Sequence, residues 1–94
     1  MGPCMYVVCR SYTNAYDDYY ERDILVSVEC YHKLEDAHAE CVRLCREMVS
    51  RRVDKIGPEP QIKVANGKAS FTDDDETYEF YVVGLPVKNP YTPR

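Results

Sequence analysis

This chain of 94 residues lacks any long hydrophobic run and any recognisable export signal. No apolar stretch approaches the roughly eighteen residues that a transmembrane helix needs, so we expect no membrane partner. The first thirty residues contain no basic region followed by an apolar run, and the five cysteines are an odd number for a disulfide framework. We therefore predict an intracellular protein, in the cytoplasm or the nucleus, with reduced cysteines.

The chain also lacks an excess of positive charge and the short motifs of known catalytic centres. Its net charge of −4 argues against binding to duplex DNA, which requires a concentrated basic face. No nucleophile elbow or comparable signature accompanies its five cysteines and two histidines. We therefore predict no catalytic residue, no cofactor and no enzymatic activity.

Tryptophan is absent and phenylalanine occurs twice, whereas tyrosine occurs nine times. Tyrosine combines a large apolar ring with a hydroxyl group that needs a partner, so it suits sheet surfaces, core margins and interfaces. The hydrophobic share of 45% and the charged share of 30% are ordinary for a globular protein. We expect one domain over residues 4–87, followed by a flexible tail over residues 88–94.

The segment from residue 34 to about residue 53 has the pattern of one amphipathic helix. Its apolar residues recur at steps of three and four, as they do on one side of an α-helix. Glu35 and Asp36 favour the positive end of the helix dipole, and Gly57 and Pro58 cannot continue a helix. Such a helix is long enough to cover one face of a small sheet. The apolar positions are Leu34, Ala37, Cys41, Leu44, Cys45, Met48 and Val49.

The remaining segments alternate in hydrophobicity with a period of two, which predicts strands. Asn66 and Gly67 tolerate positive φ and indicate a turn, whereas the polar and acidic residues 13–22 predict a long hairpin loop. The order β-β-α-β-β indicates an α+β domain of two layers, with one helix on a four-stranded, mainly antiparallel sheet. The expected strands are residues 5–12, 23–31, 68–72 and 77–85, and residues 61–64 form a short extended piece.

A single helix covers only one face of a sheet, so the opposite face is expected to need a partner. Alternation places Tyr6, Val8 and Tyr12 together on one side of the first expected strand. It likewise places Tyr81 and Val83 on one side of the last strand. We expect these five side chains to line the face opposite the helix, and such an apolar surface predicts a homodimer or another protein partner.

The expected loop at residues 13–22 contains Tyr16, Tyr19 and Tyr20, and four carboxylates lie between residues 17 and 23. Core packing does not account for all three rings, and tyrosine is enriched at the hot spots of protein interfaces. We therefore interpret the chain as a non-enzymatic protein-protein interaction module that homodimerises through a sheet face or an edge strand. The candidate interaction residues are Tyr6, Tyr12, Tyr16, Tyr19, Tyr20 and Tyr81.

A small zinc-binding domain is one alternative. His38, Cys41 and Cys45 lie at positions i, i+3 and i+7 of the expected helix, and imidazole with thiolate is a ligand set that zinc prefers. The chain has no Cys-x-x-Cys pair, however, and cysteine is also among the most frequently buried small apolar residues. The spacing therefore favours buried packing over a metal site.

A single-stranded nucleic-acid binder is the second alternative. Tyr6, Tyr12 and Tyr81 on one sheet face would be comparable to the aromatic platforms on which bases stack. Such platforms also need lysine or arginine on the same face, and only Arg10 lies near these tyrosines. Nucleic acid is therefore a less favoured partner than protein.

The succession of short motifs resembles a family of small, mostly fungal hypothetical proteins. In that family a Tyr-Val-Val strand, an acidic loop, a second strand with an aromatic end and a Leu-Glu-x-Ala helix follow one another. The resemblance spans residues 6–85 and implies a β-β-α-β-β domain with no assigned activity, so it supplies no site residues. The matching pieces are Tyr6-Val7-Val8, Tyr16-Asp17-Asp18, Cys30-Tyr31, Leu34-Glu35-Asp36-Ala37, Asn66-Gly67 and Tyr78-Glu79-Phe80-Tyr81-Val82.

Overall fold

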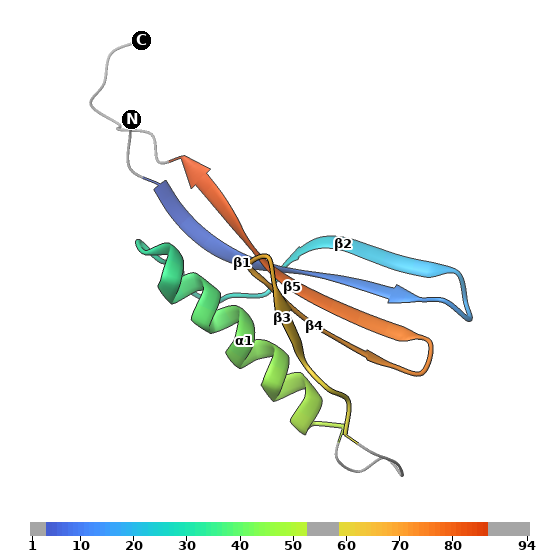
Figure 1. The fold of residues 1–94 in the computed structure, drawn as a ribbon. Coiled ribbons are helices and arrows are strands. Elements are labelled where there is room, and N and C mark those ends of the chain that lie inside the picture. The colour runs from blue at the N-terminus through green and yellow to red at the C-terminus, as the bar shows by residue number, and fades with distance from the viewer. Residues whose placement is uncertain (1–3, 53–58, 87–94) are drawn as a thin grey trace.

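The computed structural model describes residues 4–52 and 59–86, and in this part of the chain it consists of one helix and five strands (Figure 1). In chain order these are β1 (Cys4–Asn14), β2 (Tyr19–Leu25), α1 (Leu34–Ser50), β3 (Lys63–Ala65), β4 (Lys68–Asp73) and β5 (Glu76–Pro86). The α+β class is as predicted. The expected number of four strands is wrong, because β3 pairs with β4 across the turn at Asn66 and Gly67.

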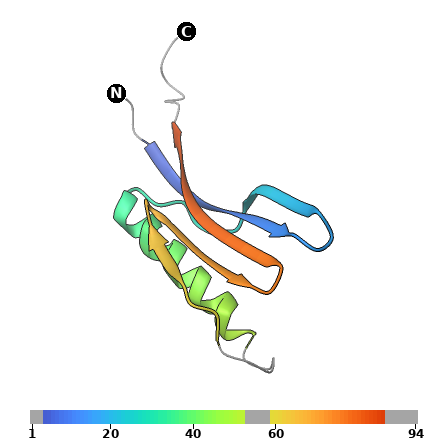
Figure 2. The same cartoon turned by 45° about the vertical axis from the view of Figure 1, so that its right-hand side comes forward.

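Every pair of neighbouring strands is antiparallel, and the strand order is β2-β1-β5-β4-β3. The two longest strands, β1 and β5, form the centre of the sheet and pair along their whole length, from Cys4 opposite Pro86 to Asn14 opposite Glu76. α1 packs on β5, β4 and β1. β2 lies away from the helix in both views (Figures 1 and 2). The sheet therefore has two edge strands, and α1 does not cover β2.

The helix predicted from residue 34 onward is confirmed, and it ends at Ser50. Residue 53, at which we expected it to end, lies outside the described residues, as does the expected tail at 88–94. Leu34 is 43% exposed, so the buried stripe is narrower than the sequence pattern. In the described part of the chain, no helix is long and apolar enough to cross a membrane. The buried helix residues are Ala37, Cys41, Cys45 and Val49. The last three form one core cluster with Val8, Ala69, Phe71 and Phe80 of the sheet.

The register of β1 determines which of its side chains face α1. Val8 is fully buried in the core beneath the helix, and Tyr6 and Tyr12 share its side of the strand because side chains alternate. The expectation that Tyr6, Val8 and Tyr12 line the face opposite the helix is therefore wrong. Both alternating sets of β1 side chains are apolar, so alternation alone does not show which set is covered. The opposite side of the sheet, called the open face below, carries Val7, Cys9, Tyr81 and Val83.

The first hairpin has a shorter turn than the sequence predicts. Residues 19–22, expected in a loop, belong to β2, and residues 26–31, expected in a strand, follow it. Asn14 Oδ1 accepts hydrogen bonds from the backbone N–H groups of Tyr16 and Asp17, at 3.0 and 3.1 Å. This side-chain turn closes the hairpin early, and the paired tyrosines at the start of β2 then favour a strand.

Residues 26–31 connect β2 to α1 along the side of β1. The backbone N–H groups of Val26 and Ser27 donate to Val8 O at 3.0 and 3.3 Å, and Ser27 Oγ accepts from Val8 N–H at 3.0 Å. Further along, Tyr6 and Tyr31 exchange two backbone hydrogen bonds of 2.8 Å each. These bonds satisfy the backbone of β1 beyond the point where β2 ends.

Gly67 occupies a position in the β3–β4 turn where a side chain would be strained. Its φ is +74°, and a Cβ atom there would lie 3.0 Å from His38 Nε2. Gly67→Ala is expected to lower the free energy of unfolding by about 1–2 kcal/mol, because of the left-handed backbone and the crowded imidazole. Urea denaturation measures this change. Gly84→Ala, at a strand glycine without positive φ, should change it by less than about 0.5 kcal/mol, and equal losses at the two sites would contradict the argument.

Candidate protein-interaction surface

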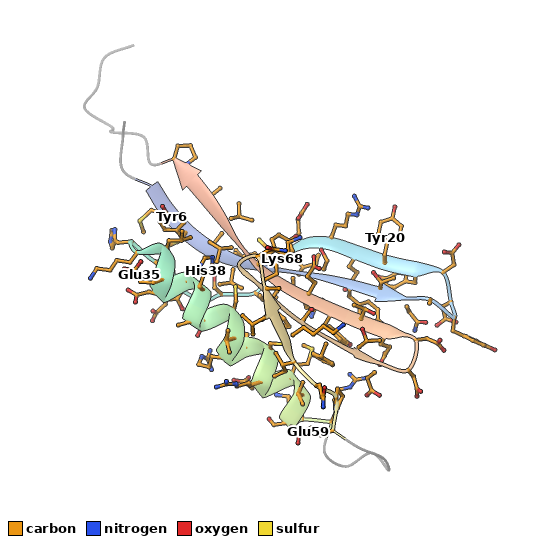
Figure 3. All side chains as sticks on the ribbon, viewed as in Figure 1. Tyr6, Tyr20, Glu35, His38, Glu59 and Lys68 are labelled. Carbon is orange, nitrogen blue, oxygen red and sulfur yellow. The ribbon has the colours of Figure 1, made fainter. Side chains whose placement is uncertain are left out.

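β2 is an edge strand whose side chains are almost all exposed. Of its seven residues only Glu21 is partly buried, while Tyr20 and Leu25 are 64% and 61% exposed. Figure 3 shows Tyr20 projecting from β2 on the side away from α1. An exposed edge strand with apolar and aromatic side chains offers both hydrogen-bonding backbone groups and contact area to an added strand. β2 is therefore the candidate interaction surface.

A β-bulge interrupts the pairing of β1 with β2. Between the pairs Arg10–Ile24 and Tyr12–Glu21, β2 contains one residue more than β1. Asp23, within this interval, has a φ of 56°, in the left-handed region that aspartate tolerates better than most residues. Asp23 therefore accommodates the backbone conformation at the extra residue of the bulge.

The bulge places Tyr20 and Leu25 on the same face of the sheet. Tyr20 pairs with Thr13 and Leu25 pairs with Cys9, and both partners belong to the open-face set of β1. Regular alternation would put residues 20 and 25 on opposite faces, because they are an odd number of positions apart. The two exposed side chains thus lie at opposite ends of one edge, on one face.

A chain of side-chain hydrogen bonds fixes the position of Asp23. The hydroxyl of Tyr81, on β5, donates to Asp23 Oδ1, and Ser11 Oγ, on β1, donates to the Tyr81 hydroxyl oxygen at 3.3 Å. Burial and the bond to the Asp23 carboxylate raise the pKa of Tyr81, so its hydroxyl remains a donor at neutral pH. The bulge is therefore tied to the two central strands.

These residues border an open hollow of about 610 Å³ on the open face. Its charges are mixed: Lys68 Nζ lies 3.3 Å from Glu79 Oε1, and the Arg22 guanidinium lies 5.4 Å from the centre of the Tyr20 ring. A site for a simple anion would need a clear excess of cations, which this hollow lacks. Mixed charges beside tyrosine are instead typical of the rim of a protein interface. The lining residues are Ser11, Thr13, Tyr20, Glu21, Arg22, Asp23, Lys68, Glu79 and Tyr81.

Arg22 and Asp23 differ from the other charged side chains around the hollow. Glu21 is paired with Arg10 at 2.9 Å, and Lys68 is paired with Glu79. Within residues 4–52 and 59–86, neither Arg22 nor Asp23 forms an ion pair. One cation and one anion without an ion-pair partner thus stand side by side at the centre of the exposed strand.

The structure distributes the six predicted interaction tyrosines over several places. It brings Tyr20 and Tyr81 together at the hollow. Tyr16 lies at the hairpin turn and is 84% exposed. Tyr12 and Tyr19 form a pair on the helix side, with ring centroids 6.1 Å apart, and Tyr6 lies near the start of α1 (Figure 3). The sequence analysis missed Arg22, Asp23 and Leu25, because their placement depends on the bulge.

An aromatic and arginine cluster supports the sheet where α1 ends. The centre of the Tyr78 ring lies 5.7 Å from the guanidinium group of Arg10 and 5.5 Å from that of Arg52. Arg52 also donates to Asp73 Oδ2 at 2.8 Å and to Glu76 Oε2. Because these arginines are already engaged within the chain, we assign this cluster to stability and not to binding.

The predicted zinc ligands of α1 do not come together in the described part of the chain. There, no three histidine, cysteine, aspartate or glutamate side chains form a group that could hold a metal ion. Cys41 and Cys45 are buried in the core, and His38 lies over Gly67. Burial raises the pKa of both thiols to about 11, so they are neutral and poor nucleophiles at physiological pH.

Comparison with known proteins adds no identity, since no family model, no curated protein and no solved structure matches this chain. The resemblance to small fungal hypothetical proteins therefore stays a prediction.

The buried thiols predict a loss of stability at alkaline pH. Below pH about 9 Cys41 and Cys45 are neutral in both the folded and the unfolded chain, whereas between about 9 and 11 the unfolded chain ionises first. The free energy of unfolding should therefore fall over that range, as urea denaturation at a series of pH values would measure. The double variant Cys41→Ala, Cys45→Ala should show a smaller fall. An identical pH dependence in both proteins would contradict the assignment.

Proposed function

We propose that this chain is a non-enzymatic protein-interaction domain that self-associates through its sheet. The observation that carries the proposal is the exposure of β2, an edge strand that α1 does not cover and that presents Tyr20, Ile24 and Leu25 to solvent. Exposed apolar side chains beside an unpaired strand edge favour addition of another strand. Of the surfaces described, this one is best suited to bind protein.

The edge is a better candidate for self-association than the centre of the open face. Val7 and Cys9, the central apolar residues of the open face, are only 6% and 7% exposed, so a partner would bury little more of them. The exposed apolar side chains lie instead at the margins of that face, at Tyr20 and Leu25 on β2 and at Leu85 near the end of β5. Burial of these side chains would contribute most of the hydrophobic gain on association.

Two further observations support the proposed cellular setting and the absence of catalysis. The cysteines Cys9, Cys30, Cys41 and Cys45 are free thiols, as expected in the reducing interior of a cell. Three of them are buried, where a thiol has little access to a substrate. We therefore include an intracellular location and a non-enzymatic role in the proposal.

The proposal predicts that the protein is a dimer at micromolar concentration. Leu25→Ser should raise the dissociation constant of the dimer about tenfold or more, because each copy loses a leucine that is buried at the contact. Sedimentation equilibrium measures both. Val64→Ser is the matched control, because Val64 lies on the other edge strand and is likewise 61% exposed. It should leave the association unchanged. A monomeric wild-type protein at all accessible concentrations would refute self-association.

A further inference from the structure

Resting on the proposed self-association, we infer that a second copy of this chain pairs its β2 with β2 of the first, antiparallel about a two-fold axis, with Arg22 opposite Asp23 of the second copy. This register also places Tyr20 opposite Leu25 and Glu21 opposite Ile24. The two sheets then form one continuous sheet of ten strands, twice the five described in one chain.

The side-chain faces select this register. Tyr20 and Leu25 both lie on the open face, so their contact across the axis keeps every side chain on its own face. A shift of one residue would place Tyr20 opposite Ile24 or Val26. Ile24 pairs with Arg10 on the helix side, and Val26 packs against the core beneath α1. Either shift would therefore pair Tyr20, on the open face, with a residue whose side chain lies on the helix side of the sheet.

The backbone directions select the same register. Val26 N–H donates to Val8 O of β1. Backbone groups alternate in direction along a strand, so those of Ile24, two residues earlier, also point to β1, and those of Leu25 point away from the sheet. At the other end, Ala15 N–H bonds to Asp75 O, on the β5 side of β1. The backbone N–H and C=O groups of even-numbered β1 residues therefore point to β2. Because Glu21 pairs with Tyr12, its backbone groups point toward β1, whereas those of Tyr20 point away from the sheet. Tyr20 and Leu25 can thus form a hydrogen-bonded pair between copies.

The charges complete the match. Arg22 and Asp23 have no ion-pair partner within the described residues of their own chain, and the two-fold axis brings each against the opposite charge of the other copy. The bulge does not disturb this contact, because the two bulge residues of one strand face the two bulge residues of the other. The edge is therefore complementary to itself in shape and in charge.

Charge reversal in separate proteins tests the register. In the Arg22→Glu dimer each contact between residues 22 and 23 would hold two carboxylates, and in the Asp23→Lys dimer it would hold two cations. The dissociation constant of each variant alone should therefore rise about tenfold or more. An equimolar mixture should recover wild-type affinity as a heterodimer, measured by native mass spectrometry. Circular dichroism confirms that each variant is folded. Lys63→Glu, on the opposite edge strand, is the matched control and should not change dimerisation.

Cross-linking gives a second measurement that does not depend on residue 23. In a Cys4→Ser, Cys30→Ser background the remaining native thiols, Cys9, Cys41 and Cys45, are buried, and Tyr20→Cys mixed with Leu25→Cys should form a disulfide-linked heterodimer. Directly paired residues lie within disulfide distance, at about 5.5 Å between Cα atoms. If the wild type is a dimer but neither the heterodimer nor the cross-link forms, the register is wrong while the proposed function stands. If the wild type is a monomer, self-association itself is wrong, and this inference with it.

Discussion

The continuous pairing of β1 with β5 is the constraint on which the rest of the structure depends. Eleven successive residue pairs join the two strands without a shift in register. The face of the sheet on which each β1 and β5 side chain lies is therefore fixed along both strands. This places Val8 and Phe80 on one face, where α1 buries them. The helix of 17 residues is about 25 Å long, whereas a strand of eleven residues spans about 36 Å. One end of the sheet therefore extends beyond the helix, and β2 lies uncovered there (Figure 1).

Those parts of the fold that depend on local chemistry could be predicted from the sequence. The turn at Asn66 and Gly67 was expected from their tolerance of positive φ, and φ values of 54° and 74° confirm it. The face of Tyr81 and Val83 in β5 was also predicted, because alternation places them together, and both lie on the open face. In β1 both alternating sets are apolar, so its orientation depended on contacts with α1 that the sequence does not specify. The same reason explains why Tyr6 and Tyr12 were assigned to the wrong face.

The candidate surface was less predictable than the fold. Tyr20 was selected because a ring among carboxylates is difficult to place in a core, and that reasoning did not require the correct strand boundaries. Leu25 was assigned to a strand, but its exposure follows from the short reach of α1, which is a tertiary property. The bulge depends on the pairing partners of β2 and on the bond from Tyr81 to Asp23, a residue 58 positions away in the sequence. Long-range contacts of this kind leave no periodic signal in the sequence.

A bulged and charged edge strand ordinarily protects a protein against indiscriminate pairing with other strands. β3, at the opposite edge, is protected in a simpler way, since it has only three residues and begins with Lys63. β2 is longer and presents Tyr20, Ile24 and Leu25 to solvent, so charge and the bulge have to provide its protection. A regular foreign strand would be one residue short across the bulge and would leave Arg22 and Asp23 without opposite charges. Another copy of β2 meets both requirements, so the features that exclude other strands are the same ones that admit a second copy.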